Sequence, residues 1–226
     1  MTRKLRALTI VVMAAFAATA VVASDASAVD LFTSTSTNAK TIVTGEQVGK
    51  HKIVIIGQPL ECSIVHFEAT QSGNSSEDLS FTPKYEGHCT YNGQTASVTA
   101  NSCKFTVKSQ TNEGGHNVVQ IVNCPTGAPL ILHIIVGGLP CTLTIIEQTV
   151  SEGVKFTNET TGIKKAETMH STTKIKIHAA SATPLACKAM AGTSPPYSGL
   201  TTLIGKEDTP GGAQVDITVD EAPDAT

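Results

Sequence analysis

Tryptophan is absent from this 226-residue chain, and aromatic residues make up only 4% of it. Proteins that bind long sugar chains usually stack the sugar rings on exposed tryptophan or tyrosine side chains. A long carbohydrate-binding platform is therefore not expected. The three tyrosines, Tyr85, Tyr91 and Tyr197, leave room only for a small carbohydrate site.

Long apolar runs are also missing, with one exception at the N-terminus. Arg3, Lys4 and Arg6 precede an apolar run from Ala7 to Val22, and Ala26-Ser27-Ala28 supplies small residues for cleavage. This order is typical of a secretory signal peptide. We predict that residues 1–28 are removed near Ala28 and that the mature chain, with no membrane span, is secreted or held at the cell surface. The alternative is a retained anchor, for which the run is short.

The chain also has no excess of basic residues. The formal net charge is −3, and it becomes −5 once residues 1–28 are removed, because that segment carries three basic residues and one acidic residue. Nucleic acids and acidic membrane surfaces are bound by basic patches, so neither is expected as a partner. A hydrophobic content of 40% does support a folded core.

Catalytic and metal-binding motifs are missing as well. The chain has no Gly-x-Ser-x-Gly, His-Glu-x-x-His, phosphate-binding glycine loop or Cys-x-x-Cys sequence. No catalytic residue, cofactor or metal ligand is therefore predicted, and the expectation is a protein that is not an enzyme. His170 and His178 could share a metal, but scattered surface histidines are the simpler interpretation. The acidic C-terminal residues Asp216, Asp220, Glu221 and Asp224 do not follow a calcium-loop pattern.

What the sequence does contain is six cysteines, an even number that indicates three disulfides in an exported chain. Six cysteines allow 15 pairings, and hairpin geometry narrows them because bridged Cα atoms must be close. A hairpin folded at Glu113-Gly114 places Cys103 opposite Cys124 and Phe105 opposite Val122. A second, folded at Ser75-Ser76, places Cys62 opposite Cys89. Cys141 and Cys187 remain as the third pair.

The adjacent residues His88 and Cys89 raise the alternative of a catalytic dyad. Neighbours along a strand point to opposite faces, which argues against it. The same alternation predicts that Ile64 lies on the face of Cys62, with Val65 and Phe67 on the other face.

Short β-branched runs separated by turn residues predict an all-β protein, an antiparallel β-sandwich stapled by disulfides. The only helical signal after the N-terminus is one turn at Ala186 to Met190. The expected strands are Thr41 to Val48, Lys52 to Ile56, Leu60 to Phe67, Leu79 to Tyr85, Thr95 to Ala100, the two strands of the Cys103–Cys124 hairpin, Leu130 to Val136, Leu139 to Ile146, Val154 to Thr157, Thr172 to His178, Thr201 to Ile204 and Gln214 to Val219.

An internal duplication is suggested because Cys62, Ile64 and Glu68 fall on Cys141, Leu143 and Glu147 at a constant offset. The alternative is that strands of similar composition look alike. The predicted organisation is a flexible lead-in at 29–40, a first β half at 41–129, a second β half at 130–220 and a disordered acidic tail at 221–226.

Four local patterns together resemble a group of uncharacterised secreted proteins from actinobacteria. They are the Cys-x-x-x-x-Phe strand at Cys62, Phe81-Thr-Pro-Lys-Tyr, Asn101-Ser-Cys-Lys-Phe and Cys124-Pro-Thr-Gly, behind an export signal. The resemblance covers most of the mature chain. It implies a secreted bacterial β protein with framework cysteines and carries no known activity or catalytic residue.

The function expected from these observations is a binding or structural role outside the membrane, without catalysis and with an unknown ligand. The alternative is an extracellular hydrolase whose site has no recognisable motif, with His66, Glu68, His133 and Glu147 as the residues to inspect first. A third interpretation is a self-associating envelope protein, because unpaired edge strands can pair between copies.

Overall fold

The computed structural model of the chain describes residues 32–112, 115–150, 154–180 and 184–220. Every strand pair in this part is antiparallel, and the one helical turn is α1 (Leu185–Lys188). The predicted signal peptide, the acidic tail and the Glu113-Gly114 turn lie outside the described residues. No described helix has the length and apolar character needed to cross a membrane.

Seventeen strands make up the described fold. Their bounds are β1 (Phe32–Ser34), β2 (Lys40–Ile55), β3 (Gln58–Ser72), β4 (Ser75–Ser76), β5 (Asp78–Tyr91), β6 (Gln94–Thr99), β7 (Lys104–Asn112), β8 (Gly115–Asn123), β9 (Leu130–Val136), β10 (Leu139–Ile145), β11 (Gln148–Val150), β12 (Val154–Asn158), β13 (Ala166–Lys174), β14 (His178–Ala179), β15 (Pro196–Glu207), β16 (Gln214–Val215) and β17 (Ile217–Val219).

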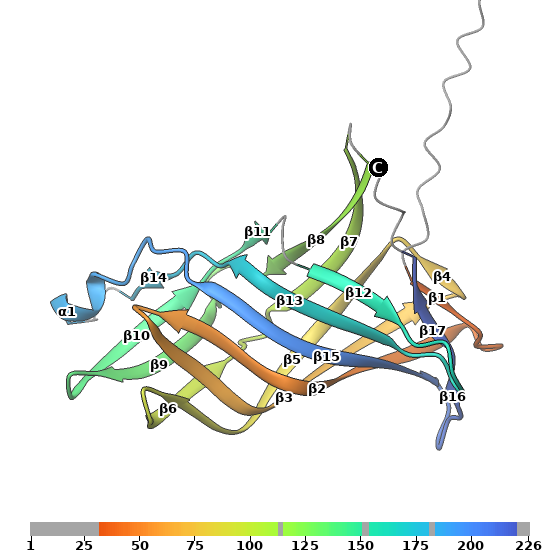
Figure 1. Cartoon of the computed structure of the whole chain (residues 1–226), viewed down its shortest axis with the longest axis horizontal. Helices are drawn as coiled ribbons and strands as arrows, with labels where there is room; N and C mark the ends of the chain where they lie inside the picture. Colours follow the sequence, from red (N-terminus) through yellow and green to blue (C-terminus); the bar gives the residue numbers. More distant parts are fainter. Residues whose placement is uncertain (1–31, 113–114, 151–153, 181–183, 221–226) are drawn as a thin grey trace, which may run out of the picture.

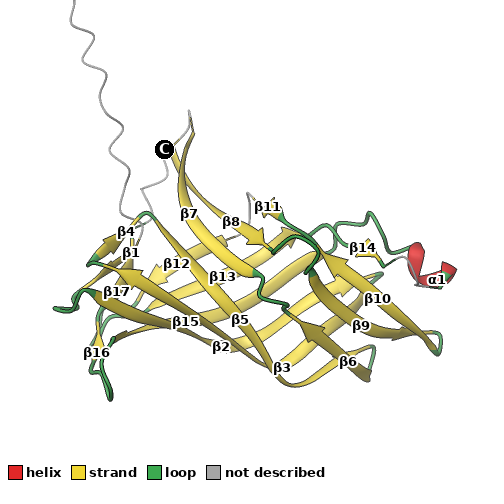
Figure 2. Ribbon diagram, turned by 180° about the vertical axis from the view of Figure 1, so that it is seen from behind, coloured by secondary structure: helices red, strands yellow, loops and turns green. Residues whose placement is uncertain are grey.

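The strands form two layers with the core between them, which confirms the predicted antiparallel sandwich (Figures 1 and 2). One layer has the order β12-β13-β15-β2-β3-β5. The other holds β7, β8 and β11 beside β6, β9, β10 and β14. Strand β5 belongs to both layers, because one part of it pairs with β3 and another part with β7.

Three hairpins are closed by two-residue turns in which both residues have positive φ. They are Ile56-Gly57 between β2 and β3, Asn92-Gly93 between β5 and β6, and Gly137-Gly138 between β9 and β10. Such turns match the right-handed twist of the strands that they join. Ile56 is the exception in residue type, since a β-branched side chain rarely adopts positive φ.

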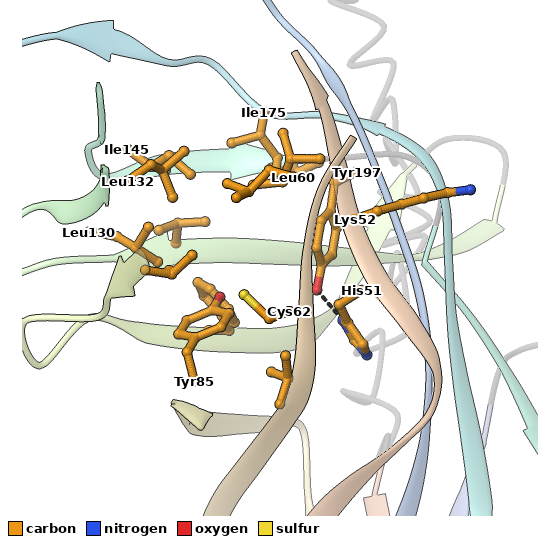
Figure 3. A pocket seen from close by; sticks show the side chains of 16 residues that line it. His51, Lys52, Leu60, Cys62, Tyr85, Leu130, Leu132, Ile145, Ile175 and Tyr197 are labelled. Atoms are coloured by element: carbon orange, nitrogen blue, oxygen red, sulfur yellow. Dashed lines mark hydrogen bonds between the residues drawn. The ribbon is translucent and has the colours of Figure 1, made fainter. Parts of the chain in front are cut away.

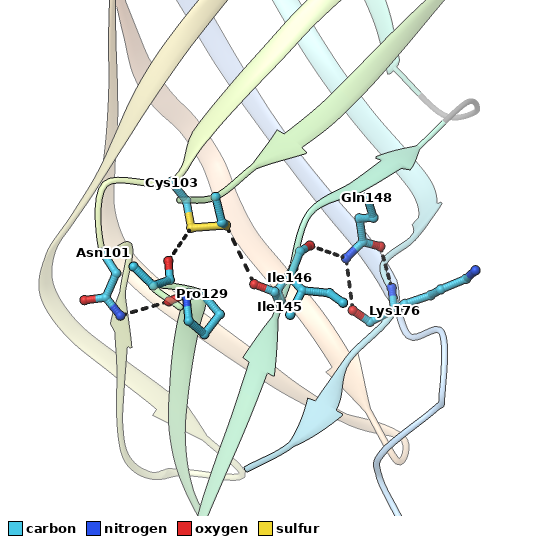
Figure 4. The surroundings of a disulfide bond; sticks show 9 residues. Asn101, Cys103, Pro129, Ile145, Ile146, Gln148 and Lys176 are labelled. Carbon is cyan, nitrogen blue, oxygen red and sulfur yellow. Dashed lines mark hydrogen bonds between the residues drawn. A yellow bond between two sulfur atoms is a disulfide. The ribbon is translucent and has the colours of Figure 1, made fainter. Parts of the chain in front are cut away.

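All three predicted disulfides are present: Cys62–Cys89, Cys103–Cys124 and Cys141–Cys187. The register around Cys103 is also as predicted, with Phe105 opposite Val122. Near this bridge the Gln148 side-chain amide donates to the Lys176 carbonyl at 3.0 Å and accepts from the Lys176 N–H at 2.7 Å (Figure 4). The amide thereby ties β11 to the segment that precedes β14.

The predicted flexible lead-in is wrong for its described part. Phe32 begins β1, is fully buried, and makes edge-to-face contacts with the rings of Phe81 and Phe156. Strand β1 pairs with β4 and β17 in a small three-stranded sheet. The serine- and threonine-rich composition of this segment suggested flexibility, but the buried Phe32 side chain fixes β1 to the core.

The predicted facing of Ile64 is also wrong. Cys62, Val65 and Phe67 are all buried, whereas Ile64 is exposed. The register shifts between Cys62 and Ile64, where β5 carries one residue more than β3. This one-residue offset reverses the alternation of side chains along β3, so Val65 and Phe67 are buried on the same side as Cys62. His88 is exposed and Cys89 buried, so the predicted opposition of these neighbours is confirmed.

Strands from both predicted halves share one sheet. Strand β2 pairs with β15, and β6 pairs with β9, across the boundary at residue 130. The two aligned cysteines also differ in position. Cys62 follows the glycine of its hairpin turn by five residues, and Cys141 follows Gly138 by three.

Candidate functional site

Two of the four residues considered for a hydrolase lie together on the outer face of the β2-β3-β5 sheet. His66 Nε2 lies 3.9 Å from a carboxylate oxygen of Glu86, and Glu68 accepts a hydrogen bond from Lys84 at 3.0 Å. All four side chains are about half exposed. They form cross-strand polar pairs, as is common on the solvated side of a sheet.

The other two lie elsewhere. His133 is exposed on β9, where its Nδ1 is 3.2 Å from the Thr142 hydroxyl, and Glu147 is exposed between β10 and β11. The structure therefore does not gather the four residues into one site.

The alternative metal-binding residues are also dispersed. His170 lies on β13 and His178 on β14, which belong to different layers. Asp216 accepts a hydrogen bond from the Lys164 N–H at 2.9 Å. Glu221 and Asp224 lie outside the described residues. Within the described residues, no three histidine, cysteine, aspartate or glutamate side chains are grouped so as to hold a metal ion.

A polar cleft opens where β3 and β5 part. Their last paired residues are Glu68 and Thr82, and the next residue along β5, Phe81, already pairs with Phe105 of β7. Strand β3 continues to Ser72, paired with β2. In Figures 1 and 2, β5 runs diagonally away from β3 toward β4. We call the space between these diverging segments the β3–β5 cleft.

The β3–β5 cleft has a volume of about 450 Å³ and a predominantly hydroxyl-bearing lining. Asp78 and Lys104 stand on its β5 and β7 side, opposite Glu68 on β3. The lining residues are Glu68, Ala69, Thr70, Ser72, Ser75, Ser76, Asp78, Leu79, Ser80, Thr82 and Lys104. Such a surface can hydrogen-bond an uncharged polar ligand from several directions.

Part of the cleft wall is fixed by local hydrogen bonds. The Asp78 N–H donates to the Ser76 hydroxyl at 3.3 Å, and that hydroxyl also donates to the Asp78 carbonyl. Ser80 and Thr106 hydroxyls lie 2.6 Å apart across β5 and β7. The β5 side is therefore held in place by hydrogen bonds to β4 and β7.

A second depression of about 310 Å³ adjoins the cleft on the same outer face. Glu68 lines both spaces, and the second is also lined by His66 and by the charged residues Glu46, Lys84 and Glu86. The two depressions therefore meet at Glu68.

The opposite end of the β3–β5 pair contains a buried polar cluster of His51, Tyr197 and Thr201. His51 on β2 is 4% exposed and lies opposite Cys62 of β3. Its Nδ1 is 2.5 Å from the Tyr197 hydroxyl (Figure 3). Its Nε2 is 2.9 Å from the Thr201 hydroxyl. The pairing of β2 with β15 and the pairing of β2 with β3 both shift register near this residue. Bulges of this kind turn a side chain away from its regular direction.

Burial sets the protonation state of this cluster. Desolvation lowers the pKa of His51 from 6.5 to about 4, against a smaller opposing effect of a hydrogen bond with the Leu200 backbone. Burial also raises the pKa of Tyr197, with a further contribution from nearby Tyr85. At neutral pH both groups are therefore uncharged, and the imidazole nitrogens are engaged by hydroxyl groups.

The cavity beside His51 is small and mostly apolar. It lies between the two layers and has a volume of about 30 Å³. Apolar side chains such as Leu60, Leu132 and Ile145 surround it (Figure 3). A water molecule needs about 10–15 Å³, so this space has room for no more than about two or three waters. Its size fits a structural role for the His51 cluster better than a role in substrate binding.

Asp78 and Lys104 are the cleft residues that sequence reasoning missed. Neither belongs to a recognisable motif, and they are distant in the chain. One signal was present in Pro83, which follows the point where β5 changes partner. Proline lacks the N–H that a central strand needs, so it marks an interruption in a sheet.

Comparison with known proteins finds no match to a protein family, to a curated protein or to a solved structure.

Proposed function

We propose that the mature chain is an exported, non-catalytic protein that binds a ligand in the β3–β5 cleft. The observation that carries this proposal is the contrast between the cleft and the interior. The cleft is open to solvent, holds about 450 Å³ and bears both hydroxyl and charged groups. The interior cavity is smaller by an order of magnitude, and its neighbouring polar groups bond one another.

Export is supported by two independent features. The N-terminal sequence has the order of a secretory signal, and the fold contains three disulfides, which persist in oxidising compartments. Expression of the full chain in a secreting bacterial host should release a product that begins at Val29. A product that keeps residues 1–28 would contradict export by cleavage.

The binding proposal is tested by blocking the cleft. Thr70 is exposed and lines the cleft, whereas Thr95 is exposed on β6 outside it. Purified chain 29–226 and the variants Thr70→Arg and Thr95→Arg are screened against bacterial polysaccharides and a phage-displayed library of random heptapeptides. We expect at least one ligand that binds the wild type and Thr95→Arg but not Thr70→Arg. Absence of any ligand with this pattern would overturn the proposal.

A second candidate function is a polysaccharide hydrolase, because two carboxylates, Glu68 and Asp78, line the same cleft. Glycosidases commonly use a pair of carboxylates on either side of the bond that they cleave. Turnover of a polysaccharide by the wild type, lost in both Glu68→Gln and Asp78→Asn, would favour this function. Binding without turnover would favour the non-catalytic one.

A further inference from the structure

We propose that the β3–β5 cleft accepts an extended peptide segment of another protein, which adds as a strand between β3 and β5. This inference rests on the proposed binding function and names the class of ligand. It starts from backbone groups, because the cleft is lined by parts of β3 and β5 that lie beyond the point where the two strands stop pairing.

Each wall has one strand partner and one open side. Residues 69–72 of β3 pair with β2, and residues 78–81 of β5 pair with β7. On the sides that face the cleft, neither segment pairs with another strand in the described part of the chain. In an antiparallel sheet, successive residues direct their N–H and C=O groups alternately to the two neighbouring strands. Each wall therefore presents alternate backbone groups toward the cleft, except that the Asp78 N–H and carbonyl already bond the Ser76 hydroxyl.

The repeat of these groups favours a peptide. A strand supplies donors and acceptors to both of its neighbours at the spacing of the sheet, and strand addition is an established mode of peptide recognition. Each wall has four residues, and four residues of strand span about 13 Å. The matching occupant is an extended segment of about three or four residues.

The side chains of the cleft indicate what such a segment should carry. Ala69 and Leu79 line the cleft and are 5% and 3% exposed, so they form an apolar floor. Thr70, Ser72 and Ser80 are exposed at its rim. Because strand side chains alternate between faces, the segment should alternate small apolar with polar residues.

A saccharide is the competing occupant. It could hydrogen-bond the hydroxyl groups and the carboxylates of Glu68 and Asp78, but none of the described residues that line the cleft is aromatic and could stack a sugar ring. Nor does a sugar reproduce the repeat of two strand edges. The cleft therefore favours a peptide, and saccharide binding becomes one outcome of the test.

The test begins with heptapeptides selected from a random phage-displayed library on chain 29–226. Selected peptides are synthesised with unmodified backbones. Matched controls carry N-methyl groups on alternate residues, which remove the backbone N–H groups that would bond a neighbouring strand. We expect the unmodified peptides to bind the wild type and Thr95→Arg with affinities within about twofold, because Thr95 is an exposed position outside the cleft. Thr70→Arg should weaken binding at least about tenfold because the larger side chain fills the cleft. N-methylation should weaken binding to a similar extent because strand addition depends on main-chain hydrogen bonds.

Amide hydrogen exchange locates the bound peptide. Bound peptide should slow exchange in residues 69–72 and 78–81 and leave the Thr95 region unchanged. Peptides that bind Thr70→Arg and the wild type equally, or that tolerate N-methylation, would overturn the inference, as would failure to select any peptide. Polysaccharide binding that is lost in Thr70→Arg would then leave the proposed function standing with a different ligand. Absence of both ligand classes would overturn both proposals.

Discussion

The two ends of the β3–β5 strand pair are built in opposite ways. At one end Cys62 and Cys89 face each other and are bridged, a bulge follows, and His51 lies on the neighbouring strand within a buried hydrogen-bonded cluster. At the other end the strands part after Glu68 and Thr82 and leave a solvated cleft. One end is covalently locked, and the other is open on both of its edges.

This difference separates polar groups that stabilise the fold from polar groups that remain available. Near the locked end, the buried His51 nitrogens bond the hydroxyl groups of Tyr197 and Thr201. An enclosed polar group is costly unless it has such partners. At the open end water can hydrogen-bond the same kinds of groups, so a ligand can replace the water. Substitutions at the locked end should therefore affect stability, and substitutions in the cleft should affect binding.

The largest expected effect is removal of the bridge at the locked end. Replacing Cys62 and Cys89 together by alanine releases a loop closed over 27 residues. In the chain-entropy account this lowers the free energy of unfolding by about 3–4 kcal/mol. Urea denaturation of the oxidised wild type and the double variant measures the loss. A loss below about 1 kcal/mol would show that this bridge does not lock the strand pair.

Acidification should weaken the locked end through His51. Its pKa is about 4 in the folded chain and 6.5 as an ordinary histidine, so the unfolded chain binds more protons between these values. Stability should therefore rise by up to about 3 kcal/mol from pH 4 to pH 6.5 and change little from this source above pH 6.5. Urea midpoints across this range measure the slope.

The His51→Gln variant is the matched control for this pH dependence. It keeps a polar side chain at the position but does not titrate. The difference in stability between wild type and variant should therefore grow by up to about 3 kcal/mol as the pH rises from 4 to 6.5. Parallel pH profiles for the two proteins would assign the dependence to other groups.

A smaller effect is expected where β15 passes the His51 ring. A Cβ atom added at Gly199 would lie 2.4 Å from His51 Nδ1, which is too close for any side chain. Gly199→Ala should lower the unfolding free energy by about 1–3 kcal/mol through overpacking. Gly49→Ala is the control, because its Cβ would lie no closer than 3.4 Å to Leu200. Equal melting temperatures for the two variants would contradict the close packing of β15 against His51.

The smallest effect is expected at the open end. Glu68 and Lys84 form an exposed ion pair, and such pairs contribute about 0.2–1 kcal/mol. Glu68→Gln and Lys84→Met should each change stability by less than about 1 kcal/mol, and their coupling in a double-mutant cycle should decrease with added salt. A coupling above about 2 kcal/mol would place this end among the stabilising parts of the fold.

The sequence predicts the locked end far better than the open one. Cysteine spacing and turn residues place Cys62 opposite Cys89 because local hairpin geometry determines that pairing. The bulge that exposes Ile64 inserts only one residue and leaves no distinct pattern. The change of partner in β5 depends on β7, some 25 residues further along the chain. It is therefore determined by tertiary contacts and not by the local sequence. Pro83 indicates that the pairing of this strand is interrupted, but it does not identify the strand that pairs with β5 beyond the interruption.

Hydrogen exchange along the unliganded strand pair tests the central claim most directly. If β3 and β5 are locked at one end and open at the other, amides of residues 60–66 and 85–91 that face between the two strands should be protected. In residues 69–72 and 78–81, amides directed into the cleft should exchange rapidly, alternating with protected amides that bond β2 and β7. Continuous protection through residues 69–72 and 78–81 would mean that the edges are already paired, and it would contradict the account.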